Sequence, residues 1–131
     1  MRVALPSLSG LTASERWFVG TVLGGLAQGC RARGRPALAA VFHVLAEAVS
    51  SARAPRAIDL DPLADLDDGE LDDLVRVLQT RRGECERQGA AGEASFYGDV
   101  LIGLDDERAR RGKVLAAIDE HMTWYEQHTS L

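Results

Sequence analysis

An uncharged stretch near the start of the chain constrains the fold more than any other feature. Thr12 and Glu15 have the spacing of a capping box, which predicts that a helix begins here. No charged residue occurs between Arg16 and Arg31. Apolar residues of this stretch recur at the spacing of one helical face: Val19, Val22, Leu23, Leu26 and Cys30. Residues 13–30 are therefore predicted to form a helix that packs one side into a core.

The opposite side of this predicted helix carries small and aromatic residues where charged ones are usual. These residues are Trp17, Gly20, Thr21, Gly24 and Gln28. A glycine inside a helix costs about 1 kcal/mol relative to alanine, so several glycines in one helix need a structural reason. A helix with no charged side is usually contacted all round. We expect a central helix within one bundle or, as the sharper alternative, a helix shared with a second copy or a partner protein.

Turn signals in the next segment predict a helical hairpin. Gly34 suits the left-handed end of the first helix, and Pro36 suits the first position of a second helix over residues 36–53. So short a connection favours two neighbouring antiparallel helices. Asp67 and Glu70 form a second box-like start, which predicts a third helix.

The C-terminal third is predicted to be helical as well. A glycine-containing break at residues 88–92 precedes a fourth helix, and Asp105 and Asp106 suit the cap of a fifth, although one continuous helix also fits. Leu115, Ile118, Met122 and Tyr125 would form its core face. Runs of β-branched residues are scarce, which argues against a sheet. The expected fold class is all-α, an antiparallel four- or five-helix bundle with a central glycine-rich first helix.

The domain organisation expected from these patterns is simple. Residues 1–11 contain Pro6 and Gly10 and are predicted to be a flexible leader, either disordered or with its leucines tucked onto the bundle. Residues 12–131 are predicted to be a single helical domain with an acidic linker at residues 54–69. A chain of 131 residues is long enough for one hydrophobic core.

The net charge of −5 is concentrated in one place. Residues 59–73 hold eight acidic and no basic residues, whereas the rest of the chain is slightly basic. The spacing does not match a calcium-binding loop, so a solvated linker is the simpler interpretation. The alternative is an acidic docking strip for a basic partner, with these residues as candidates: Asp59, Asp61, Asp65, Asp67 and Asp68.

Arginines cluster around the predicted hairpin turn. Arg31, Arg33 and Arg35 suit the C-terminal end of the first helix, where positive charge is stabilising. They are also candidate anion contacts, because Arg35 adjoins the N-terminus of the second helix. An acidic protein with a single lysine and no interleaved aromatic residues is not typical of nucleic-acid binding.

Histidine and nucleophile patterns predict no catalytic or metal site. His121 and His128 are about 10 Å apart along one helix, too far to share a metal ion. With Trp124 they form a candidate interface patch next to the core face. No catalytic triad, nucleotide-binding or zinc motif occurs, so we expect no enzyme, no cofactor and no metal.

These patterns favour a small cytoplasmic interaction protein. Two cysteines in no disulfide pattern suit a reducing compartment, the chain start lacks a signal peptide, and the uncharged run is too short to span a bilayer. The leading hypothesis is a non-enzymatic regulator or accessory subunit that binds a partner protein or itself as a homodimer. Two alternatives stay open: a nucleic-acid-binding transcriptional regulator that uses the arginine clusters, and a helical-bundle enzyme or small-ligand carrier.

Overall fold

The structure, a computed structural model, describes the backbone of residues 1–129 and the side chains of residues 1–112. The helices in that range are α1 (Ala13–Ala32), α2 (Pro36–Ser50), α3 (Asp68–Arg87) and α4 (Ala91–Thr129). Two short strands, β1 (Arg2–Ala4) and β2 (Ala57–Asp59), and two 3₁₀ helices, Leu8–Gly10 and Asp61–Asp65, complete the fold. The predicted all-α class is confirmed, and the predicted fourth and fifth helices form one continuous α4.

Local signals set the helix ends. Thr12 and Asp67 each accept a hydrogen bond from the third backbone N–H of their helix, and the glutamate there bonds back, so both capping boxes are present. Gly34 has a φ of 70°, which only glycine adopts without strain, and it ends α1 before Pro36 begins α2. Gly89, with a φ of 75°, has the same role between α3 and α4.

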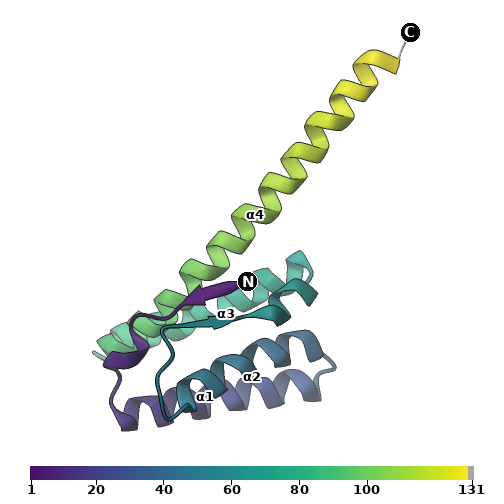
Figure 1. The fold of residues 1–131 in the computed structure, drawn as a ribbon. Coiled ribbons are helices and arrows are strands. Elements are labelled where there is room, and N and C mark those ends of the chain that lie inside the picture. Colours follow the sequence, from purple (N-terminus) through teal and green to yellow (C-terminus); the bar gives the residue numbers. More distant parts are fainter. Residues whose placement is uncertain (130–131) are drawn as a thin grey trace.

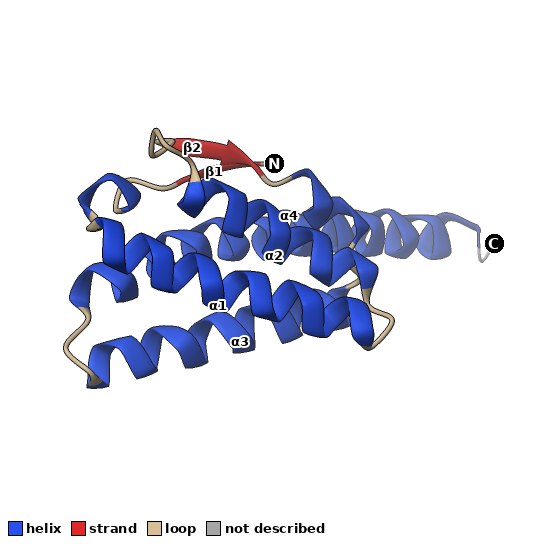
Figure 2. Ribbon diagram, turned by 90° about the horizontal axis from the view of Figure 1, so that it is seen from below, coloured by secondary structure: helices blue, strands red, loops and turns tan. Residues whose placement is uncertain are grey.

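The helices pack in two pairs around one core. The α1–α2 hairpin lies beside the α3–α4 pair (Figures 1 and 2). Fully buried side chains come from all four α-helices, from the N-terminal segment and from the segment between α2 and α3: Leu8, Leu23, Leu45, Leu60, Leu74, Leu78, Phe96 and Leu104. In α1, only Val19, Leu23 and Ala27 are buried. The first helix is therefore not central, contrary to our expectation, because one of its sides is open to solvent.

Residues 1–11 are part of the fold and not a loose leader. β1 pairs antiparallel with β2, with Val3 opposite Ile58, so a small sheet forms that the sequence argued against. The backbone N–H of Ser7 donates to Asp99 Oδ2 at 2.8 Å. Apolar side chains of this segment are buried at alternating and then helical spacing: Val3, Leu5, Leu8 and Leu11. The alternative in which the leucines tuck onto the bundle is therefore the observed one.

The C-terminal half of α4 extends beyond the other helices (Figure 1). The helix spans 39 residues, whereas α3, its packing partner, spans 20. The predicted core face Leu115, Ile118, Met122 and Tyr125 lies outside the residues whose side chains are described. Within the described residues, no helix is long and apolar enough to cross a membrane.

A glycine in α4 lets β1 pack closely. A Cβ atom at Gly103 would lie 2.8 Å from a methyl group of Val3, which is itself buried. We therefore expect Gly103→Ala to destabilise the protein by about 1–2 kcal/mol, since overpacking outweighs the gain in helix propensity. Urea denaturation measures this change. The same substitution at Gly112, where a Cβ would meet nothing within 4 Å, should be neutral or stabilising.

A double variant isolates the cause. Adding Val3→Ala to Gly103→Ala should cost less than the two single changes together, because the shortened side chain leaves room for the new methyl group. Purely additive effects would mean that Gly103 does not serve the β1 contact.

Candidate protein-interaction surface

Two adjacent aromatic side chains on α1 are open to solvent. Trp17 is 71% exposed and Phe18 is 47% exposed. Among residues 1–112, the other exposed large hydrophobic side chains are Met1 and Ile102, which are not neighbours in sequence. Isolated exposed apolar residues are common on protein surfaces, whereas contiguous exposed apolar patches are typical of interaction sites.

An uncharged stripe continues from these aromatics along α1. Its residues follow one helical face: Ser14, Trp17, Phe18, Thr21, Gly24, Gly25 and Gln28. The hydroxyl of Thr21 donates a hydrogen bond of 2.8 Å to the carbonyl oxygen of Trp17. A Cβ atom at Gly24 or Gly25 would meet nothing within 4 Å. We call these seven residues the α1 stripe. Trp17 and Phe18 form its aromatic end, and Gly24 and Gly25 form a notch near its other end.

Gly20 has a different role from the other glycines predicted for this surface. A Cβ atom there would lie 2.9 Å from Ser50 Oγ, so Gly20 allows α2 to pack closely against α1. The structure thus places Gly20 in the α1–α2 contact, and it places Phe18 and Gly25 on the stripe. Helical spacing in the sequence already puts both residues on the flank of this face.

A hollow beside Trp17 enlarges the surface toward α2. It has a volume of about 240 Å³ and is lined by Ala13, Arg16, Trp17, Val49 and Ser50. The guanidinium of Arg16 donates to the carbonyls of Val49 and Ser51, which caps the end of α2. Arg16 is thus held by the end of α2, and the surface of the hollow is mainly apolar.

The C-terminal part of the predicted interface cannot be compared with the stripe. Trp124, His121 and His128 lie outside the residues whose side chains the structure describes. Their backbone belongs to the extended half of α4.

The three arginines of the hairpin turn differ in their contacts. Arg35 Nη2 forms an ion pair of 2.7 Å with Asp73, and this hydrogen bond raises the pKa of Arg35. Arg31 and Arg33 are exposed. Arg33 and Arg35 border a second hollow of about 240 Å³ between α1, α2 and α3, whose remaining walls are mostly apolar. Because Asp73 neutralises Arg35, the anion contact predicted there loses its central charge.

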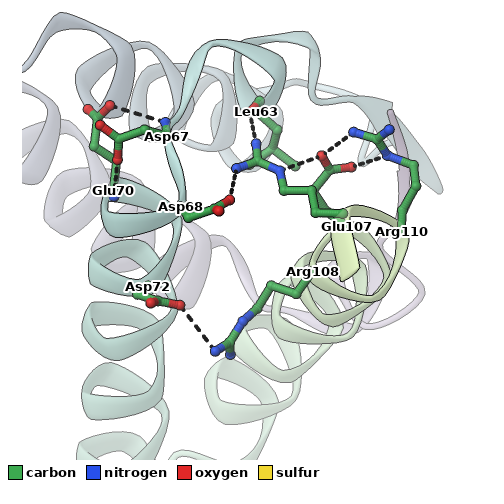
Figure 3. A network of polar contacts seen from close by, with 9 residues as sticks. Leu63, Asp67, Asp68, Glu70, Asp72, Glu107, Arg108 and Arg110 are labelled. Atoms are coloured by element: carbon green, nitrogen blue, oxygen red, sulfur yellow. Dashed lines mark hydrogen bonds and ion pairs between the residues drawn. The ribbon is translucent and has the colours of Figure 1, made fainter. Parts of the chain in front are cut away.

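Two acids of the predicted docking strip hold the N-terminus of α3. Asp67 caps the helix, as its capping box requires. Asp68 accepts a hydrogen bond of 3.0 Å from Arg111 of α4. These contacts lie within the chain, so this half of the strip stabilises the fold (Figure 3).

The other three acids lie before α3. Asp59 ends β2 opposite Arg2, Asp61 lies 3.8 Å from the terminal amine, and Asp65 is exposed. The leucines interleaved with the strip, Leu60, Leu63 and Leu66, are buried in the core. These leucines therefore cannot contact a partner together with the acids, and the acidic docking strip itself stays a prediction.

A buried glutamate organises a second arginine group on α4. Glu107 is only 3% exposed and binds Arg110 at 2.6 Å and Arg111 at 3.0 Å, as drawn in Figure 3. Arg111 also donates to the carbonyl of Leu63 and so ties α4 to the segment before α3. The bond from Arg110, followed by that from Arg111, lowers the pKa of Glu107 to about 2. Glu107 and these arginines therefore have a structural role, which the sequence did not predict.

A further cluster of ionisable groups lies near the C-terminal end of α3 and the N-terminal ends of α4 and α1. Burial raises the pKa of Glu93, and the nearby Glu15 raises it further. Burial also raises the pKa values of Cys85 and Tyr97. None of these three side chains lines a described hollow. Within residues 1–112, no group of three or more histidine, cysteine, aspartate or glutamate residues has the geometry to hold a metal ion.

Comparison of the chain with protein-family models, curated proteins and solved structures finds no match.

Proposed function

We propose that this chain is a small non-enzymatic interaction protein, a regulator or accessory subunit that binds a protein through the α1 stripe. The observation that carries the proposal is the exposure of Trp17 and Phe18 on a helical face without charge. Aromatic residues dominate binding energy at protein interfaces, whereas charged residues are depleted from interface centres. A cytoplasmic location is part of the proposal, because the thiols of Cys30 and Cys85 are both free.

The surface supports protein binding better than small-molecule binding. The hollow toward α2 at Trp17 and the one at Arg35 each measure about 240 Å³. A wider hollow of about 530 Å³ over Ser14, Trp17 and Phe18 lies open to solvent on the stripe itself. Pockets for drug-sized ligands usually measure 300–1,000 Å³ and enclose most of the ligand, which an open surface does not. A stripe about 21 Å long on a straight helix suits the side of another helix instead.

Nucleic-acid binding has less support, because arginines that could bind phosphate already form ion pairs within the chain. Arg35, Arg108 and Arg111 each form an ion pair with an aspartate of α3. Phosphate binding would have to compete with these pairs, and the net charge of −5 opposes it.

Site-specific photo-crosslinking tests the proposal. A photoreactive amino acid at Thr21 should form covalent adducts with a protein in the cells that make this chain. Thr80 of α3 is a matched control, since both threonines are exposed and donate to the carbonyl four residues earlier. Adducts from position 21 and not from position 80 support the proposal, whether the captured protein is a second copy or another protein. Equal yields from both positions would reject it.

A further inference from the structure

The α1 stripe is arranged symmetrically about Thr21. Counting outward from this residue, Phe18 and Gly24 lie at equal distances, as do Trp17 and Gly25 and, further out, Ser14 and Gln28. One side of the stripe thus carries large rings at the positions where the other side carries glycines.

We infer that a second copy of this chain covers the stripe, with the two α1 helices antiparallel and crossing near Thr21. This inference rests on the proposed function and names its partner. A two-fold axis at Thr21 brings the aromatic pair of each copy alongside the glycine pair of the other. Such an interface must be self-complementary, because the same patch is used on both subunits. Trp17 and Phe18 would fill the space left at Gly24 and Gly25, where a Cβ atom meets nothing within 4 Å.

Charge favours a second copy at this face. The chain carries a net charge of −5, so two copies repel each other over most of their surfaces. The stripe has no charged side chain from Trp17 to Cys30, so two copies can approach here without placing like charges opposite each other. A strongly basic or acidic partner would find no complementary charge on the stripe.

The exposed area indicates how strong the dimer should be. At 150–250 Å² for a buried aromatic side chain, the exposed parts of Trp17 and Phe18 amount to roughly 200–300 Å² per copy. A standard interface buries about 800 Å² per partner. The aromatic pair supplies about a third of that, so we expect a reversible dimer whose formation depends on concentration.

The glycine notch offers a variant that separates dimerisation from folding. Gly24→Leu should weaken dimerisation about tenfold or more, because the new side chain occupies the space that the partner's aromatic ring needs. Its melting temperature at low concentration should not fall, since nothing lies within 4 Å of the new Cβ and leucine favours a helix. Gly112→Leu on α4 is the matched control and should leave dimerisation unchanged.

Mixing two variants tests the antiparallel arrangement. Phe18→Ala lacks the ring that faces Gly24 of the other copy, and Gly24→Leu fills the space at that position, so sedimentation equilibrium should find each one mainly monomeric. In an equimolar mixture, the intact Phe18 of one chain meets the intact Gly24 of the other. On the opposite half of the interface, the added leucine side chain meets the space that the missing ring leaves. We therefore expect the mixture to regain a heterodimer.

The outcomes distinguish this inference from the proposed function. If the native protein stays monomeric at every concentration while position 21 still crosslinks another protein, the inferred dimer is wrong. The proposed interaction surface would still stand. A native dimer that Gly24→Leu leaves intact would show that the copies meet elsewhere. A native dimer that both variants disrupt, with no recovery in the mixture, would overturn the antiparallel arrangement.

Discussion

Deletion of residues 1–11 is expected to unfold the protein. Four apolar side chains of this segment are buried: Val3, Leu5, Leu8 and Leu11. Burial of a side chain of this size contributes about 1.5–3 kcal/mol, so the segment contributes roughly 6–12 kcal/mol. A domain of this size is stable by only about 5–15 kcal/mol in total. Circular dichroism should show the loss of a cooperative thermal transition.

Point variants keep this prediction testable if the shortened chain aggregates. Leu8→Ala should cost about 2–5 kcal/mol in urea denaturation, because Leu8 is fully buried. Ser9→Ala is the control, since Ser9 is exposed and its hydroxyl makes only a long local hydrogen bond of 3.5 Å. A deletion variant with the native melting temperature would mean that the segment is the flexible leader that the sequence suggested.

Glu107→Gln is expected to destabilise the protein by about 2–3 kcal/mol at neutral pH. Glu107 has an ordinary pKa of 4.5, and its two arginine partners lower it to about 2. One pKa unit corresponds to about 1.4 kcal/mol, and the exposure of Arg110 reduces the total through solvent screening. The substitution keeps the shape of the side chain but removes the charge that both arginines bind. Urea denaturation at pH 7 measures the loss.

The pH dependence identifies the source of this stability. A carboxyl group with a lowered pKa in the folded state stabilises the protein fully above about pH 4.5. Its contribution disappears as the pH falls toward 2, where the folded protein also binds the proton. The difference between the native protein and Glu107→Gln should therefore shrink steadily across this range. A constant difference would mean that the substitution acts through packing and not through charge.

Glu86→Gln is the matched control for this pair of measurements. Glu86 binds Arg82 one turn away on α3, but both side chains are about half exposed. Exposed ion pairs contribute about 0–1 kcal/mol, so this variant should change the stability little and show no comparable pH dependence.

Patterns that depend on neighbouring residues were readable before the structure. The capping boxes at Thr12 and Asp67, the left-handed Gly34 and the proline that starts α2 all act within a few residues of the chain. Hence most helix ends followed from the sequence, although the predicted fourth and fifth helices form one continuous α4. The end of α2 differs, because the helix stops at Ser50 where a stop at Arg53 was expected. The carbonyls of Val49 and Ser51 bind Arg16 from α1, a contact that no local pattern encodes.

The candidate site was only partly predictable for a similar reason. Trp17, Thr21, Gly24 and Gln28 stand out because they replace charged residues on one helical face. Gly20 looks the same in sequence, yet it faces Ser50 of α2. The acids at residues 59–68 also looked like a binding surface. Asp68 instead binds Arg111 of α4, which is distant in sequence. Glu107 binds Arg111 within α4 itself.

The sequence by itself determined that this chain is helical, where most helices begin and end, and that α1 has an uncharged side. These properties depend on hydrogen bonds and periodicity within one helix. Only the tertiary structure decided which glycine faces α2, which acids bind arginines, and that the segment around Leu8 belongs to the core. Those outcomes depend on which distant surfaces pack together when apolar area is buried. Local sequence patterns do not encode these long-range contacts.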